Sequence, residues 1–94
     1  MVIGLCTIEF YLPASFSLKE KRSVLKSVMH RLRREFNISI AEVDYHDVLQ
    51  SALLGVVTVS NDAGYAHGQL MHVVNWIERQ RLDVDLVSYE IEMI

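Results

Sequence analysis

The sequence is poor in the residues that mark disulfide scaffolds, disordered chains and membrane spans. Its single cysteine, Cys6, cannot form an internal disulfide, so we expect the protein to work in a reducing compartment. A single proline, Pro13, and the lack of any polar tract argue against disorder. The longest apolar runs are about eight residues, far short of the roughly 20 that a membrane helix needs. We therefore expect a cytoplasmic protein that does not enter the membrane.

Patterns that carry chemistry are also absent. The sequence has no Gly-rich phosphate loop and no nucleophile elbow. His67 and His72 are five residues apart, about 140° on a helix, so they cannot easily share a metal. The spacing of possible ligands in 44–47 matches no known metal site, and a polar turn is the better reading. Cys6 has no cationic neighbour, which is typical of an unreactive thiol. We predict no catalytic residue, no metal and no cofactor, and we expect a protein that is not an enzyme.

What is present suits one small globular domain. The chain has 94 residues, of which 51% are hydrophobic and 22% charged, so residues 1–94 can form a single domain with its own core. Alternating β-branched and aromatic residues predict strands at 2–12, 37–44, 52–60 and 84–94. The third of these strands is nearly all apolar, which predicts a central position in the sheet.

Two apolar stripes at helical spacing predict two helices. The first covers about 18–35 and opens with a capping box, Ser17 to Glu20, and the second follows an N-cap at Asn61-Asp62. The order is then β-α-β-β-α-β. Two right-handed crossovers make this a ferredoxin-like α+β fold, a four-stranded antiparallel sheet with both helices on one face.

Charge is distributed unevenly along the chain. The formal net charge is −3, yet residues 1–35 hold seven Lys/Arg against three acids, and residues 36–94 hold two against nine. On the first helix, cationic residues follow one flank outside the apolar stripe: Lys19, Arg22, Lys26, Arg33 and Arg34. This flank is either an ordinary solvated face or a surface that follows RNA phosphates. The first hypothesis is thus a module that binds RNA or the ribosome; sequence-specific DNA binding is not expected.

Lys21 differs from the other cations, because it projects toward the edge of the apolar stripe. An ion pair with an acid on the sheet, Glu42 or Glu90, is the ordinary explanation. The alternative is an anion site at the start of the helix, built from Lys21 and free backbone amides.

The second hypothesis is a homo-oligomer, such as a homodimer. The sheet face without helices is predicted to carry Glu9, Thr58, Ser60, Glu90 and Glu92 beside Ile3, Leu5 and Tyr11. Its acidic character argues against RNA binding by the sheet, and its apolar part could pair two subunits. On the second helix, Tyr65 and Trp76 share a stripe with Gln69 and His72. This stripe is either a protein interface or a place where Trp76 seals the core.

Several segments resemble the YlxP-like family, small bacterial domains of unknown function. They are Leu12-Pro13, Ser17 to Arg22 (SLKEKR), Phe36 to Val43 (FNISIAEV) and Val59 to Asp62 (VSND). SLKEKR is the most specific of them, whereas Phe16 and Gly64 depart from the pattern. The resemblance implies a ferredoxin-like fold and a bacterial gene often near translation and ribosome-maturation genes. It implies no activity, cofactor or catalytic residue.

Overall fold

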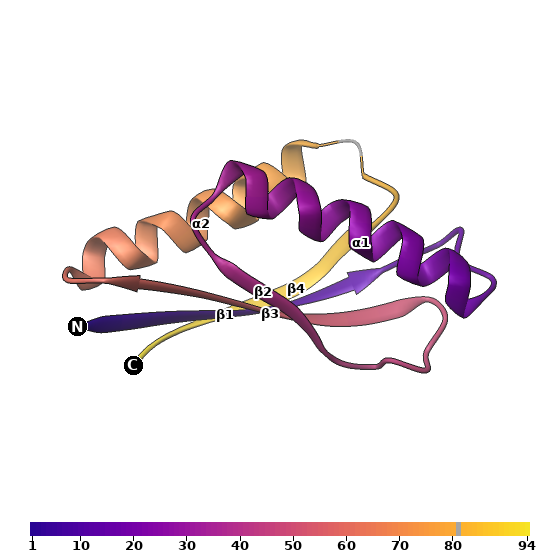
Figure 1. Cartoon of the computed structure of the whole chain (residues 1–94), viewed down its shortest axis with the longest axis horizontal. Helices are drawn as coiled ribbons and strands as arrows, with labels where there is room; N and C mark the ends of the chain where they lie inside the picture. Colours follow the sequence, from indigo (N-terminus) through magenta and orange to yellow (C-terminus); the bar gives the residue numbers. More distant parts are fainter. Residues whose placement is uncertain (81) are drawn as a thin grey trace.

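A computed structural model describes residues 1–80 and 82–94 of the chain and confirms the ferredoxin-like order. Its elements are β1 (Val2–Tyr11), α1 (Leu18–Glu35), β2 (Ser39–Asp44), β3 (Ser51–Ser60), α2 (Ala63–Arg79) and β4 (Asp85–Met93). All neighbouring strands are antiparallel, in the order β2-β3-β1-β4, so β3 is central as predicted. Both helices lie on one side of the sheet, and the other face is uncovered (Figure 1).

The core is a single layer between the sheet and the two helices. On β1 the even-numbered residues point inward, and Cys6, Ile8 and Phe10 are fully buried. Period-two alternation of this kind is what a sheet with one covered face requires. The helices contribute their apolar stripes, which are Leu25, Val28 and Leu32 from α1 and Leu70, Val73, Val74 and Ile77 from α2. None of the helices in the described part of the chain is long and apolar enough to cross a membrane.

Both helices begin where the capping residues predict. The Glu20 amide donates to Ser17 Oγ at 3.1 Å, and the Gly64 amide donates to Asp62 Oδ1 at 3.1 Å. The second half of the capping box differs from expectation. The Glu20 carboxylate accepts a hydrogen bond from the Ser17 hydroxyl at 3.3 Å, and not from the Ser17 amide. One backbone donor of the first turn is therefore satisfied by the cap.

Two assignments of side chains to sheet faces are corrected by the pairing register. Thr58 and Ser60 pair with Gly4 and Val2, which places both on the helix-covered face and not on the open one. Thr58 is buried, and its hydroxyl donates to Gln69 Oε1 at 3.3 Å. Alternation could not reveal this, because β3 is apolar on both faces and its two sides look alike in sequence.

Strand β4 does not alternate regularly, because its pairing with β1 contains an irregularity. Ser88 pairs with Glu9 but Leu86 pairs with Phe10, so Val87 occupies a β-bulge. The bulge shifts the phase of the strand by one residue. Leu86 consequently packs against the core, and Val87 is 55% exposed.

We expect a methyl group to have opposite effects on stability at Gly68 in α2 and at Gly4 in the facing strand β1. A Cβ at Gly68 in α2 would meet nothing within 4 Å, so Gly68→Ala should stabilise the protein by about 1 kcal/mol through helix propensity. A Cβ at Gly4 in β1 would lie 2.9 Å from Leu70 Cδ1, so Gly4→Ala should destabilise it by about 1–3 kcal/mol. Urea denaturation of both variants and the wild type measures the difference. Stabilisation by Gly4→Ala would contradict the close approach of α2 to β1.

Candidate nucleic-acid interface

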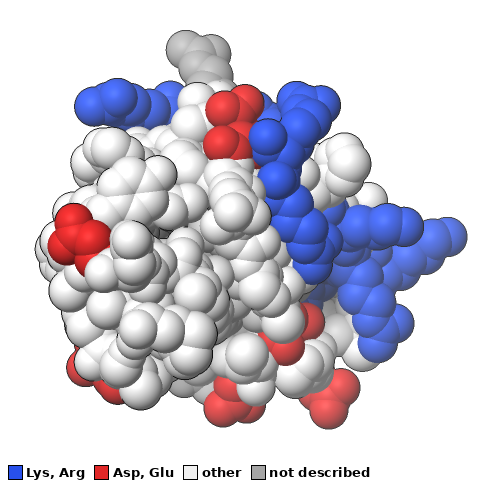
Figure 2. Space-filling view, turned by 60° about the vertical axis from the view of Figure 1, so that its left-hand side comes forward, with Lys and Arg blue, Asp and Glu red and all other residues white. Residues whose placement is uncertain are grey.

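The cationic residues of α1 form a ridge on the outer flank of the helix, as predicted. We call this set the cationic ridge, and its members are Lys19, Arg22, Lys26, Arg33 and Arg34. All five are exposed, because burial of Leu25, Val28 and Leu32 turns the opposite side of α1 toward the sheet. Figure 2 shows most of the blue side chains gathered along the right-hand flank of the molecule, with most of the red ones along its lower side.

Four members of the ridge have no partner within the described part of the chain. Lys19, Arg22, Lys26 and Arg34 form no ion pair and no side-chain hydrogen bond there. Arg33 differs, because its Nη2 donates to the carbonyl oxygen of Ile40 on the edge strand β2 at 2.9 Å. One nitrogen of its guanidinium is therefore committed to the fold. The free cationic set consists of the other four residues.

The buried lysine of α1 is structural. The Lys21 ammonium lies 3.0 Å from Glu42 Oε2, and its side chain is 1% exposed against 19% for Glu42. Lys21 also donates to the carbonyl oxygens of Tyr45 and His46, in the connection between β2 and β3. Glu42 Oε2 makes no well-aligned hydrogen bond, so the contact with Lys21 is chiefly an ion pair. Of the two acids proposed as partners, Glu42 is the correct one.

Arg31 holds α1 against α2, a role the sequence did not reveal. Its guanidinium carbon lies 5.4 Å from the centre of the Trp76 ring, and its Nη2 donates to Gln80 Oε1 at 3.3 Å. Trp76 also meets Phe36 edge to face at 6.3 Å between ring centres. Trp76 thus seals the edge of the core, which leaves Tyr65, 66% exposed, as the free aromatic of this stripe.

The uncovered sheet face has the opposite charge. Glu9, Glu90 and Glu92 lie on it, because they pair across the sheet with residues of the outward set. Within the described residues, Lys21 with Glu42 is the one ion pair, so these carboxylates do not neutralise the ridge. The fold therefore separates a cationic helix layer from an acidic sheet face.

Comparison with known proteins places this arrangement in a family. Residues 3–91 match the model of a family described as a protein of unknown function, DUF503. The uncharacterized protein YlxP of Bacillus subtilis (strain 168) is 35% identical over 77 residues, which cover 82% of this chain and 84% of that protein. The chain belongs to this family. The resemblance drawn from SLKEKR and the other segments is thus confirmed.

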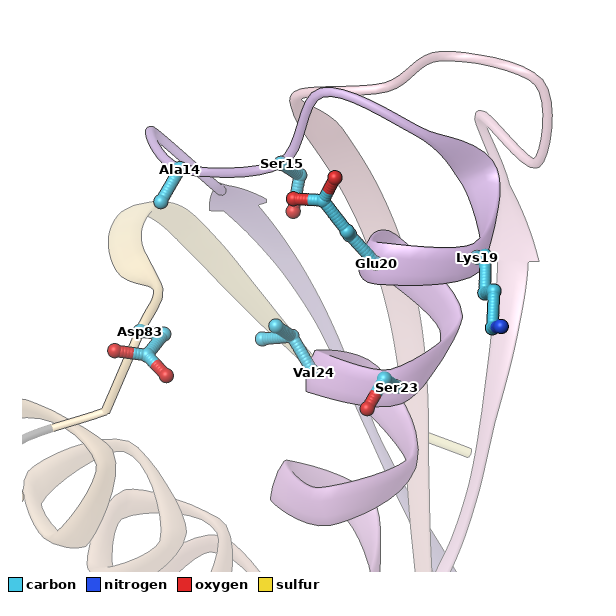
Figure 3. Close-up of a pocket in the computed structure, with 7 residues that line it drawn as sticks. All are labelled: Ala14, Ser15, Lys19, Glu20, Ser23, Val24 and Asp83. Carbon is cyan, nitrogen blue, oxygen red and sulfur yellow. The ribbon is translucent and has the colours of Figure 1, made fainter.

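In this family member the start of α1 does not form the alternative anion site. A depression of about 470 Å³ lies there, lined by Ala14, Ser15, Lys19, Glu20, Ser23, Val24 and Asp83 (Figure 3). Glu20 and Asp83 bring two carboxylates to it, and the Lys19 amine extends away along the helix. Lys21 is held under the β2–β3 connection and cannot contribute. The reading that placed Lys21 in an anion site is therefore wrong.

Neither a group of metal ligands nor an exposed thiol accompanies the ridge in residues 1–80 and 82–94. Among the described residues, no three His, Cys, Asp or Glu side chains are placed to hold one metal ion. The Cys6 side chain is fully buried, and desolvation raises the pKa of its thiol from 9.0 to about 11. At neutral pH it stays protonated and unreactive, as expected from its apolar surroundings.

We expect substitutions of Lys21 and Glu42 to have non-additive effects on the free energy of unfolding, because the two side chains form a buried ion pair. Lys21→Met leaves the Glu42 carboxylate and two loop carbonyls without their donor, and should cost about 3 kcal/mol. Glu42→Gln keeps a polar acceptor and should cost less. Urea denaturation of both single variants and the double variant gives the coupling energy, which we expect to be about 1–2 kcal/mol. Additive effects would show that the pair does not act as a unit.

Because the Cys6 thiol is buried, we expect it to make the protein less stable at alkaline pH. Because folding raises the pKa of the thiol, the folded state disfavours the thiolate. The contribution of the protonated thiol to the free energy of unfolding is therefore complete below pH 9.0 and is lost as pH rises toward about 11. The free energy of unfolding of the wild type should therefore fall more steeply over this range than that of Cys6→Ala. Denaturant titrations at several pH values measure the two slopes. Parallel slopes would contradict burial of the thiol.

Proposed function

We propose that the protein is a non-enzymatic, RNA-binding module that contacts RNA or the ribosome through the cationic ridge. The observation that carries the proposal is the row of four exposed cations, Lys19, Arg22, Lys26 and Arg34, that have no partner in the described part of the chain. Cations used for stability are usually paired or packed, as Lys21 and Arg31 are here. A row of unpaired cations on one helix of a protein with net charge −3 favours a polyanionic partner.

The shape of the ridge suits a phosphate backbone. Lys19 and Arg34 lie fifteen positions apart on one continuous helix, about 22 Å along its axis at 1.5 Å per residue. At 100° per residue the four free cations lie within about 120° of one another around the helix, so a surface of this length can contact several phosphates of one strand. Binding would then depend on charge and shape more than on base sequence, because no base-reading groups need accompany such contacts.

The acidic sheet face supports this choice of surface. Many RNA-binding domains of this architecture stack bases on sheet aromatics. Here Glu9, Glu90 and Glu92 occupy that face, and phosphates would be repelled from it. The gene neighbourhood implied by the resemblance to YlxP-like proteins agrees with a role near the ribosome. The lone, buried Cys6 supports our proposal that the protein works in the cytoplasm.

RNA binding should show the salt dependence of about four phosphate contacts. For single-stranded RNA the slope of log affinity against log salt is then about −3. Arg22→Glu should lower the affinity for all sequences alike and reduce the magnitude of the slope by about 1. Fluorescence anisotropy with a labelled, unstructured oligonucleotide across a range of salt concentrations measures both quantities.

Arg79→Glu is the matched control for this experiment. It makes the same change of charge on an exposed residue of α2, outside the ridge. If the ridge binds RNA, Arg79→Glu keeps nearly the affinity and slope of the wild type. Equal losses in the two variants would indicate a response to net charge alone, and lack of binding at low salt would refute the proposal.

A further inference from the structure

On the uncovered face of the sheet, side chains of each kind follow particular strands, although the composition of the face as a whole is mixed. The pairing register aligns the outward residues of the strands in rows across the sheet. In the order β2, β3, β1, β4, one row holds Ser39, Val57, Leu5 and Glu92, and the next holds Ala41, Gly55, Thr7 and Glu90. A third row pairs Val59 with Ile3.

The columns of this pattern separate three kinds of side chain. The two central strands present apolar residues in matching rows, Val57 beside Leu5 and Val59 beside Ile3, and Val59 is 62% exposed. The outer strand β4 presents carboxylates. The outer strand β2 presents small, uncharged side chains in the same rows. An apolar strip therefore covers the part of the face around Ile3 and Leu5, with an acidic margin on one side and a neutral margin on the other. It ends along β1 at Glu9, which pairs with Leu53.

We propose that a second copy of this chain covers the face, with a two-fold axis parallel to the strands between β1 and β3. This axis exchanges the two central columns. Val57 then lies over Leu5 of the partner subunit, and Leu5 lies over Val57 of the partner subunit. The apolar strip is thus complementary to itself, which a symmetric dimer interface requires. The two sheets stack as in a β-sandwich, about 10 Å apart and crossed by about 30°.

The carboxylates of β4 favour a two-fold axis along the strands over a two-fold axis across the strands. With the axis along the strands, β4 lies over β2 of the partner, so Glu92 faces a serine at the rim of the interface. With an axis across the strands, β4 would lie over β4, and Glu90 and Glu92 of the two copies would meet. Like charges directly opposite each other are destabilising. Only the first arrangement keeps the two acidic margins apart.

The area of the face is sufficient for a stable dimer. Three strands of nine or ten residues and one of six, about 4.8 Å apart, give a face whose covering buries roughly 600 Å² per copy. This lies at the lower end of the range for specific interfaces, which begins at about 600 Å² per partner. Because the cationic ridge lies on the opposite, helix-covered side, it stays exposed on both outer surfaces of the dimer (Figure 1). The dimer therefore does not depend on RNA binding, and either proposal can fail alone.

The oligomeric state of the full chain tests the proposal directly. Sedimentation and light scattering at high micromolar concentration should give twice the monomer mass for the wild type. Val57→Glu places a carboxylate in the apolar strip and should weaken the dimer at least tenfold. Val87→Glu, on the β4 bulge and outside the strip, should leave the dimer intact. A monomeric wild type, or a dimer unaffected by Val57→Glu, would overturn the proposal.

Substitutions at Ser39 test the axis and do not touch the apolar strip. Ser39 is exposed on an edge strand, so either charge can be introduced without disturbing the core. Ser39→Lys should tighten the dimer about fivefold by facing Glu92 of the partner subunit, and Ser39→Glu should loosen it by a similar factor. If β2 lay over β2, Ser39→Lys would instead bring two lysines together and loosen the dimer. That result would overturn the proposed axis. If circular dichroism shows that Val57→Glu does not fold, the variants Ser39→Lys and Ser39→Glu still test the proposed dimer.

Discussion

The rotation of α1 about its own axis is the constraint on which the cationic ridge depends. Leu25, Val28 and Leu32 are buried against the sheet, and burial of each such side chain contributes about 1.5–3 kcal/mol. At 100° per residue, their burial determines where every other side chain of the helix points. Turning the helix to bring Lys26 to an acid of the sheet would expose this apolar stripe. The ridge residues therefore stay in solvent because the core leaves them no other direction.

The remaining cations of α1 serve to hold the helix in place. Lys21 ties the first turns to Glu42 and to the β2–β3 connection, and Arg31 ties the last turns to Trp76 and Gln80. Arg33 reaches the Ile40 carbonyl at the edge of the sheet. Edge strands with free backbone groups invite pairing with other chains, so this contact also protects β2. The seven cations of one helix thus divide into three that bind the protein itself and four that remain available.

How much of this the sequence could predict depends on whether each feature is local. The Ser17 and Asp62 caps, the limits of α1 and the outward residues of β1 follow from neighbouring residues, and each was predicted correctly. The face of Thr58 and the bulge at Val87 were not predicted, because both depend on pairing with a distant strand. For the ridge, the sequence predicted exposure but not the commitment of Arg33, whose partner lies on β2. Partners of long side chains are set by the packing of whole elements, which no local pattern contains.

The proposed RNA contact has to be compatible with a net charge of −3, and the separation of charge makes it so. Electrostatic interactions in solution at physiological salt are screened over about 8 Å. The molecule measures 42 × 23 × 20 Å, so even its thinnest dimension exceeds two such lengths. A phosphate at the ridge therefore experiences Arg22 and Lys26 strongly and the carboxylates of the far sheet face hardly at all. The same carboxylates repel polyanions from the open face, so the charge that lowers the net total also orients the protein toward RNA with α1 first.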